Sequence, residues 1–254
     1  MEVQCYSNGA GSNISKICHC ILDRELGQLV GQKGRRKFKE QYRCEVDPQK
    51  RDWQEFIDEQ LGFPDKPCVF ADISTLYKGK CQCFSPHCIA KDGSQFVECG
   101  VQTGCMLSAT GFSCKNFSAL FSGEGGKSRE EILSNLFALL SSGDTSSGKT
   151  YRGMMGSTAR ERPLFKMWEN VMQVDQKLNQ NETKVVSLIQ DEFNIIGYVM
   201  SYKTFNANDG QLPGNKFRIY AVCMDVEQSG LAWVDAQQVV TKILADVRVF
   251  FWVW

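Results

Sequence analysis

The feature that most constrains the fold is an alternation of short β-branched or aromatic runs with longer stretches of helical period. This pattern is typical of an α/β domain with a mainly parallel sheet, because parallel strands are joined by crossovers that are usually helical. The runs that predict strands are 3–7, 42–46, 68–73, 104–110, 164–169, 198–205 and 217–224. The stretches that predict helices are 14–30, 52–61, 129–140, 182–196 and 236–247. We expect long loops over 74–102 and 141–163, where glycine, serine, cysteine and lysine gather.

Length and charge narrow the function classes. A chain of 254 residues can bury one sizeable core. Its 29 basic and 29 acidic side chains cancel, which removes the simplest signature of a nucleic-acid-binding domain but leaves a local basic groove open. Only two histidines are present, so a mechanism that needs several imidazoles has little support.

The sequence also predicts a cellular compartment. It has no apolar run near the roughly 18 residues of a membrane span, and its first residues lack the basic and apolar parts of a signal peptide. We therefore expect an intracellular protein without a membrane partner. In such a chain the 12 cysteines are expected to be mostly reduced.

Polar or glycine-rich segments follow the first three predicted strands. Ligands of open α/β sheets bind beyond the carboxyl ends of the strands, so these positions matter most. The first strand leads into a glycine turn, 7–12 (SNGAGS), where backbone can approach a ligand closely. Glu45 ends the second strand and Asp72 the third, where a ribose hydroxyl and an adenine amine can be bound. The alternative for each carboxylate is a solvated turn.

The loop after the fourth predicted strand carries Cys114 beside Lys115. A partly exposed cysteine near a cation can act as a nucleophile, whereas a buried one is inert. With 12 cysteines in the chain, a core role is the alternative for any one of them. The fifth predicted strand ends in Glu169 and Asn170, which places a carboxyl group beside this loop.

Taken in order, these segments resemble the motifs of the cytosine-C5 DNA methyltransferase family. The glycine turn is similar to a Phe-x-Gly-x-Gly cofactor loop, with Ser7 in place of Phe. Residues 111–114 (GFSC) resemble the Gly-Phe-Pro-Cys nucleophile motif, with Ser113 where proline is usual. Residues 169–171 match Glu-Asn-Val, and 206–218 are similar to Gly-x-Pro-Gln-x-Arg-x-Arg.

The resemblance implies a Rossmann-like sheet with flanking helices that binds S-adenosylmethionine. Residues 1–224 are expected to form the catalytic domain and 225–254 an unassigned tail, with no recognisable target recognition domain. The residues it implies at the cofactor are Ser7, Gly9, Gly11, Glu45, Val46, Asp72 and Ile73.

The same resemblance implies a DNA (cytosine-5-)-methyltransferase located in the nucleus. Cys114 is expected to attack C6 of the base and Glu169 to relieve the charge that develops at N3. Arg218 and Lys216 are expected to hold that charge near the base carbonyl. A duplex cytosine has to be flipped out to reach such a site. Three alternatives stay open: a tRNA cytosine-C5 methyltransferase, a non-catalytic methyltransferase-like binding module, and a chain whose C-terminal part is completed by a protein partner.

Two further patterns suggest other sites. Residues 143–150 (GDTSSGKT) fit a phosphate loop, but such a loop follows a strand and opens a helix. Here a predicted helix precedes it and 151–153 are a poor helix start, so we assign 147–151 to a Ser-Gly-x-Thr-aromatic stretch of the resembled family.

A zinc site is also suggested by Cys81, Cys83, His87 and Cys88, with Cys99 or Cys105 near. Cys-x-Cys is tighter than the usual spacing of zinc ligands. We therefore expect a loop of reduced thiols and no metal.

Overall fold

The computed structural model describes residues 2–8, 37–60, 66–85, 88, 97–113, 140, 142–143, 145–175, 177, 183–206 and 217–245, with backbone alone for 2–8 and 37–39. The strands are β1 (Glu2–Asn8), β2 (Lys37–Cys44), β3 (Cys68–Phe70), β4 (Lys80–Cys83), β5 (Val97–Gly100), β6 (Leu107–Gly111), β7 (Phe165–Val171), β8 (Tyr198–Asn206) and β9 (Phe217–Asp225). The α-helices are α2 (Pro48–Gln60), α5 (Ser146–Glu161), α6 (Val185–Ile195), α7 (Val226–Ser229) and α8 (Trp233–Ala245), and the 3-10 helices are η1 (Ile73–Lys78) and η4 (Met172–Asp175). None of the described helices is both long and apolar enough to cross a bilayer.

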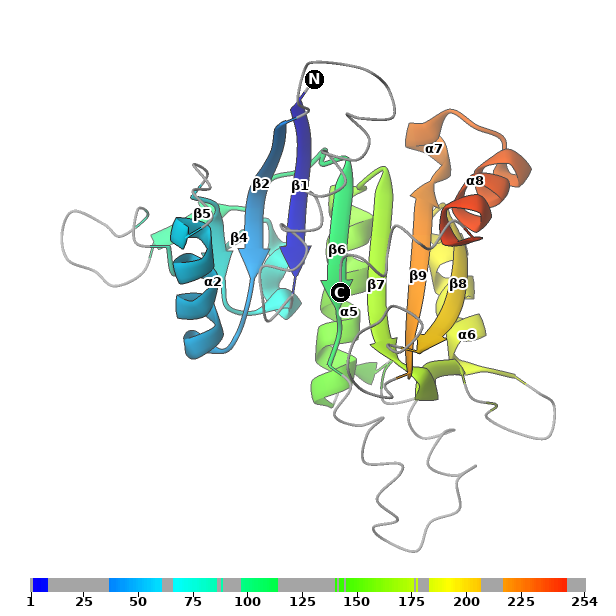
Figure 1. The fold of residues 1–254 in the computed structure, drawn as a ribbon, viewed down its shortest axis with the longest axis horizontal. Helices are drawn as coiled ribbons and strands as arrows, with labels where there is room; N and C mark the ends of the chain where they lie inside the picture. The colour runs from blue at the N-terminus through cyan, green and yellow to red at the C-terminus, as the bar shows by residue number, and fades with distance from the viewer. Residues whose placement is uncertain are drawn as a thin grey trace, which may run out of the picture.

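The nine strands of the described residues belong to one sheet, in the order β5-β4-β3-β2-β1-β6-β7-β9-β8 (Figure 1). The central strands β3, β2, β1, β6 and β7 are parallel, whereas β4 and β5 on one side and β9 on the other run antiparallel to their neighbours. The chain moves outwards from β1 to β3 and returns to β6, so the strand order reverses between β1 and β6. Such a reversal opens a ligand-binding crevice at the carboxyl ends of the strands. The expected Rossmann-like fold is thus confirmed, with antiparallel additions at both edges.

Helices cover both faces of the sheet. Successive strand residues point to opposite faces, and on β8 and β9 both sets are apolar. Met200 and Cys223 belong to the core that includes α6, whereas Val199 and Val222 pack with Val240 of α8. Figure 1 shows α6 and α8 on opposite sides of these two strands. Helix α8 lies in the region that the sequence left unassigned, and it packs on the same sheet as the rest of the domain.

Helix α5 corrects the expected loop over 141–163. Thr145 caps its first turn by accepting a hydrogen bond from the backbone N–H of Gly148 at 3.0 Å. Gly153, which suggested a loop, lies where α5 crosses η1. A Cβ atom there would lie 2.6 Å from the carbonyl oxygen of Ile73, so only glycine allows this close approach.

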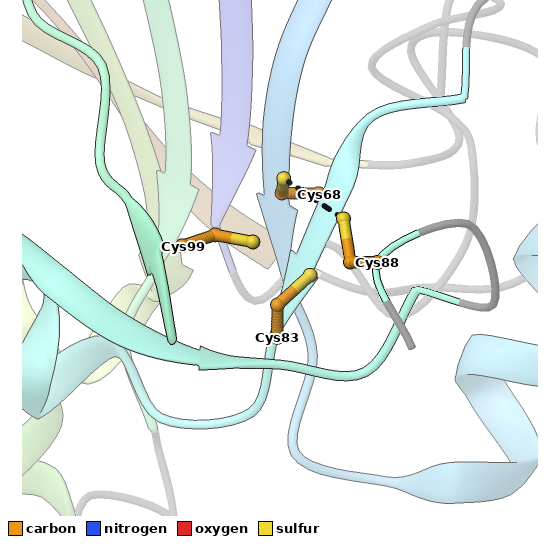
Figure 2. Close-up of side chains that lie close together, drawn as sticks. All are labelled: Cys68, Cys83, Cys88 and Cys99. Atoms are coloured by element: carbon orange, nitrogen blue, oxygen red, sulfur yellow. Dashed lines mark hydrogen bonds between the residues drawn. The ribbon is translucent and has the colours of Figure 1, made fainter. Parts of the chain in front are cut away.

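The expected loop over 74–102 is also wrong in part, because it contains η1, β4 and β5. The two strands have only four residues each, Lys-Cys-Gln-Cys in β4 and Val-Glu-Cys-Gly in β5, and these sequences give little β signal. They are recognisable only through their pairing with each other and with β3. Four cysteines, one each from β3, β4 and β5 and one that follows β4, lie close together (Figure 2). The helices predicted at 14–30 and over most of 129–140 lie outside the described residues.

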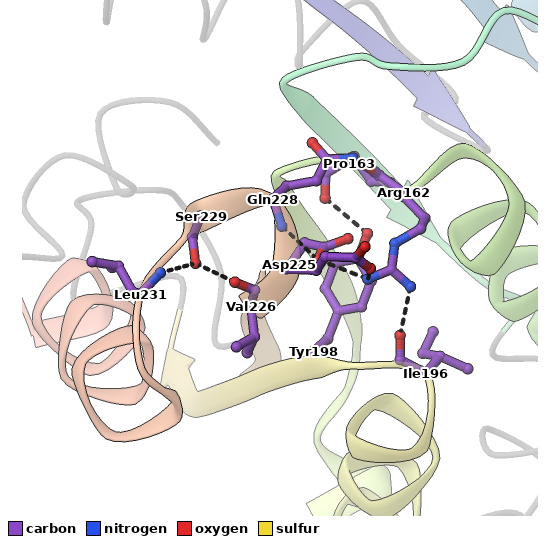
Figure 3. Close-up of polar contacts among 10 residues, drawn as sticks. Arg162, Pro163, Ile196, Tyr198, Asp225, Val226, Gln228, Ser229 and Leu231 are labelled. Atoms are coloured by element: carbon purple, nitrogen blue, oxygen red, sulfur yellow. Dashed lines mark hydrogen bonds and ion pairs between the residues drawn. The ribbon is translucent and has the colours of Figure 1, made fainter.

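A polar network joins the start of β7 to the end of β9 (Figure 3). The Asp225 carboxylate is fully buried, and it accepts from the Arg162 guanidinium at 2.8 Å. It also accepts from the backbone N–H of Gln228, which caps α7. Arg162 donates further to the carbonyl oxygen of Ile196 at 3.1 Å, and the Tyr198 hydroxyl donates to that of Pro163 at 2.8 Å. This network fixes the edge of the sheet opposite to the carboxyl ends of the parallel strands.

Candidate active site at the carboxyl edge of the sheet

Two of the predicted catalytic residues meet at the carboxyl end of β7. Glu169 is paired with Gly111 of β6 on one side and with Tyr220 of β9 on the other. Val171 is paired with Arg218, so Arg218 projects from the same face as Glu169, one diagonal step away. The Arg218 Nε atom lies 2.9 Å from Glu169 Oε1, and the two side chains are 35% and 29% exposed. The register of an antiparallel strand pair therefore brings together residues 49 positions apart in the chain (218 − 169).

Burial changes the acidity of Glu169. Removal of water from around the carboxyl group raises the pKa of Glu169, and the Arg218 guanidinium counteracts part of that rise. A carboxyl group with a raised pKa keeps its proton to a higher pH, so it can donate to a base that gains negative charge. This behaviour suits a general acid.

Asn170 holds the loop that follows β6. The side chain is buried, and its Nδ2 atom donates to the carbonyl oxygen of Phe112 at 3.0 Å. Its Oδ1 atom accepts from the backbone N–H of Val171 at 2.8 Å, which fixes the amide orientation. The Phe112 ring packs against Tyr151 and Trp168, with centroids 5.4 and 5.8 Å away. Sequence reasoning matched Asn170 to a motif but gave it no role, and only the fold shows which backbone it holds.

The next residue of that loop is tied to the first turn of α5. The backbone N–H of Ser113 donates to the Thr150 hydroxyl at 2.9 Å, and Thr150 in turn donates to the carbonyl oxygens of Ser146 and Ser147 at 3.0 and 3.1 Å. Proline has no N–H, so this anchor depends on serine standing where the resembled motif has proline. Cys114 follows directly and lies outside the described residues, as does Lys216.

These contacts also show the structural role of residues 143–150, which fit the phosphate-loop pattern. The helix begins at Ser146, inside the pattern, so the expected poor helix start was wrong. No described strand leads into it, because the described residues 140 and 142 are helical. The Thr150 hydroxyl is occupied by Ser113 and by its own helix. The segment therefore supports the loop after β6.

The predicted cofactor residues that the structure describes lie at the tips of β2 and β3. Glu45 is buried, its backbone N–H donates to the carbonyl oxygen of Phe70 at 2.9 Å, and its Oε1 atom accepts from the N–H of Asp47 at 3.0 Å. A buried carboxylate is not the solvated turn residue of the alternative interpretation. Asp72 is exposed, and its Oδ1 atom caps η1 by accepting from the N–H of Ser74 at 2.8 Å.

Val46 and Ile73, which were also predicted at the cofactor, differ in their exposure to solvent. Val46, at the tip of β2, is 73% exposed and presents an apolar side chain beside the two carboxylates. Ile73 is buried under α5 and supports the turn rather than facing solvent. Ser7 lies in β1, where only the backbone is described, and Gly9 and Gly11 lie outside the described residues.

Comparisons with known proteins found several distant similarities. Solved structures that resemble the chain include the Dnmt2 methyltransferase of Schizosaccharomyces pombe (14% identity, 88% of this chain and 50% of that one, TM-score 0.47). Others are the methyltransferase EhMeth of Entamoeba histolytica (10%, 88% and 53%, 0.48) and a DNMT2 mutant of Spodoptera frugiperda (10%, 87% and 50%, 0.46). The chain spans about half the length of these three structures. No curated protein sequence matches it.

A sequence model of one family matches residues 143–246, described as "C-5 cytosine-specific DNA methylase". The match runs from the start of α5 to the end of α8. It includes Glu169, Asn170 and Arg218 of the site but not the loop after β6 or the tips of β2 and β3. Over this segment, which is less than half of the chain, the sequence is similar to the C-5 cytosine-specific DNA methylase family.

Proposed function

We propose that the chain transfers a methyl group from S-adenosylmethionine to C5 of a cytosine in DNA. The observation that carries this proposal is the pair of Glu169 and Arg218 beside an anchored loop that leads directly into Cys114. A protonatable carboxyl group, a fixed cation and a cysteine are the groups that this reaction needs.

Cys114 supplies the nucleophile. Cytosine C5 is a weak nucleophile, and addition of a thiolate at C6 breaks the C5–C6 double bond and turns the base into an enamine. The electron pair moves towards N3, where negative charge develops. Anchors at Phe112 and Ser113 restrict the backbone that carries the thiolate, so less orientational freedom is lost at the attack.

Glu169 and Arg218 respond to the developing charge. Glu169, whose pKa is raised by burial, donates its proton to N3 as the thiolate adds. Arg218 stabilises the resulting carboxylate and the adjacent carbonyl oxygen of the base. After C5 has gained the methyl group, loss of the C5 proton to a base and expulsion of the Cys114 thiolate restore the aromatic ring, and the proton at N3 returns to Glu169.

The tips of β2 and β3 fit the cofactor. Glu45 and Asp72 offer carboxylate oxygens at neighbouring parallel strands, and Val46 offers an exposed apolar surface for a planar ring. When bound, S-adenosylmethionine supplies an electrophilic methyl group. The described residues hold it through its nucleoside, because acidic residues at these strand tips suit hydroxyl and amine donors.

Covalent trapping tests the proposal. The purified chain is incubated with S-adenosylmethionine and duplex DNA that carries 5-fluorocytosine, in which the final proton loss is blocked. We expect a complex that survives a denaturing gel, is absent in Cys114→Ser, and is retained in Cys105→Ser, which alters a buried cysteine outside the site. An RNA duplex with the same base analogue is run in parallel.

Each other outcome contradicts a named part of the proposal. Trapping of RNA alone moves the substrate from DNA to RNA. Cofactor binding in calorimetry without an adduct on either nucleic acid identifies a non-catalytic binding module. An adduct that persists in Cys114→Ser shows that Cys114 is not the nucleophile.

A further inference from the structure

Four thiol groups gather over the antiparallel edge of the sheet, far along it from Glu169. Their sulfur atoms all lie within 4.8 Å of one another (Figure 2). Among the residues that the structure describes, no second group of metal-ligating side chains gathers in this way. The four thiols belong to Cys68, Cys83, Cys88 and Cys99.

Strand register explains three of these positions. Cys83 of β4 pairs with Phe70 of β3, and Cys68 lies two residues before Phe70, so Cys68 and Cys83 project from the same face. Cys99 of β5 pairs with Cys81, which lies two residues before Cys83, so Cys99 shares that face as well. Cys68, Cys83 and Cys99, from three neighbouring strands, therefore lie on one side of the sheet.

A fixed turn returns the fourth thiol to the others. The backbone N–H of Cys88 donates to the carbonyl oxygen of Ser85 at 2.9 Å. The buried Ser85 hydroxyl donates to the carbonyl oxygen of Pro67 at 2.8 Å and accepts from the N–H of Val69 at 2.9 Å, which locks the turn onto β3. The Cys88 sulfur then lies 3.7 Å from that of Cys68.

The spacing fits a tetrahedral metal centre. Zinc–thiolate bonds of about 2.3 Å in a tetrahedron place sulfur atoms about 3.8 Å apart, so a contraction of less than about 1 Å completes the shape. Disulfide-bonded sulfurs lie about 2.05 Å apart, and all four cysteines are free. An iron–sulfur cluster separates its cysteines further, because iron and sulfide ions lie between them. Four protein ligands leave no open position, which characterises structural sites.

We propose that one structural zinc ion is bound by four thiolates, those of Cys68, Cys83, Cys88 and Cys99. This replaces the sequence-based expectation of a loop of reduced thiols. Cys81 is not a ligand, because its thiol donates to the carbonyl oxygen of Thr75 at 3.2 Å. His87 lies outside the described residues. The ion joins β3, β4, β5 and the turn at Cys88, which compensates for strands of three and four residues.

Metal content tests the proposal directly. The full chain is purified under reducing conditions without an affinity tag that binds metal, and its metals are measured by plasma mass spectrometry. We expect one zinc ion per wild-type chain and almost none in Cys83→Ser. Cys81→Ser is the matched control, because it alters the same strand and face but keeps its zinc.

A second measurement uses the unaltered chain, so that misfolding of a variant does not decide the result. Zinc is removed by a chelator and cobalt(II) is added. Four thiolate ligands give intense sulfur-to-cobalt charge-transfer bands and the visible bands of tetrahedral cobalt, and zinc then displaces the cobalt. Wild-type chain without zinc that also gives no such bands overturns the proposal. Iron with acid-labile sulfide, a disulfide between two of the four cysteines, or equal zinc loss in Cys81→Ser overturns it as well.

Discussion

The two halves of the sheet are stabilised in different ways. From β6 to β9, strands of five to nine residues are long enough for their register alone to place Glu169 against Arg218 and Asn170 against Phe112. From β3 to β5, strands of three or four residues meet in a cluster of thiols. The proposed zinc ion would cross-link these short strands, which have few backbone hydrogen bonds of their own. The family match, over residues 143–246, covers β7, β8 and β9 but neither β6 nor the short strands β3 to β5.

The largest expected effect isolates the chemistry of the long-stranded half. Glu169→Gln keeps the shape of the side chain but cannot deliver a proton, so we expect methyl transfer to fall by about 10²- to 10⁴-fold. Cofactor affinity, which in the proposal depends on the tips of β2 and β3, should stay unchanged in calorimetry. Single-turnover transfer of labelled methyl measures the rate. Glu227→Gln, on an exposed side chain, is the control. A change in cofactor affinity equal to the change in rate would show that the two halves are not separable.

The next effect concerns a buried cation in the same half. Lys166 is fully buried, and it donates to the hydroxyls of Ser108 and Thr110. Burial lowers the pKa of Lys166 to about 8, despite the opposing effects of Glu161, Cys223 and Cys105. The unfolded chain keeps that proton up to about pH 10.4.

Between about pH 8 and about pH 10.4 the unfolded chain keeps the Lys166 proton that the folded chain has lost. Lys166 therefore makes the free energy of unfolding rise by about 3 kcal/mol across this range. Lys166→Met should be more stable than wild type at pH 7, and the difference between the two should shrink from about pH 8 upwards. Urea unfolding across this range measures it. A difference that does not depend on pH would mean that Lys166 stays protonated in the fold.

A smaller effect is expected at the loop anchor. Asn170→Ala leaves the carbonyl oxygen of Phe112 and the N–H of Val171 without their side-chain partner, which costs about 1–3 kcal/mol. We also expect slower methyl transfer, because the backbone before Cys114 is then less restricted. Thermal unfolding and the trapping assay report the two effects separately. If Asn170→Ala kept both the stability and the trapping rate of the wild type, Asn170 would not be an anchor of this loop.

An effect of similar size tests the contact between the halves. Gly153→Ala places a Cβ atom 2.6 Å from the carbonyl oxygen of Ile73, so α5 and η1 have to separate, at a cost of about 1–3 kcal/mol. Because η1 begins beside Asp72, cofactor affinity should weaken as well. Gly156→Ala is the milder control, since its nearest contact is the Tyr77 Cβ atom at 3.2 Å. Equal stability of the two variants would contradict this ranking.

Predictions from the sequence were confirmed mainly where a local sequence pattern is sufficient to indicate the structure. The central strands β1, β3, β6 and β7 were predicted within three residues at each end. The predicted start of β2 was five residues late, because its first residues, Lys-Phe-Lys-Glu-Gln, include three charged side chains. Glu169 was predicted beside the loop before Cys114, because adjacent parallel strands end at the same edge of the sheet. Helix α5 was missed, because Gly153 is required by packing against Ile73 and not by a turn.

Other features depend on contacts that no local pattern reveals. The sequence pattern named three of the four clustered cysteines, Cys83, Cys88 and Cys99, but it missed Cys68 and included Cys81, whose thiol contacts Thr75 instead. Glu45 was left open between a ligand and a solvated turn, and its burial became evident only in the fold. Cys114 and Lys216 lie outside the described residues, so their roles stay predictions.

The hydrogen bond from Ser113 to Thr150 has a consequence for how the nucleophile loop is stiffened. A proline ring restricts its backbone permanently and within a single residue. A hydrogen bond, with a net contribution of about 1 kcal/mol, restricts it only while it is formed. Stiffness here is a shared property of two segments 37 positions apart, and it is reversible. A sequence change in the first turn of α5 can therefore loosen or tighten the loop while the loop itself stays unaltered.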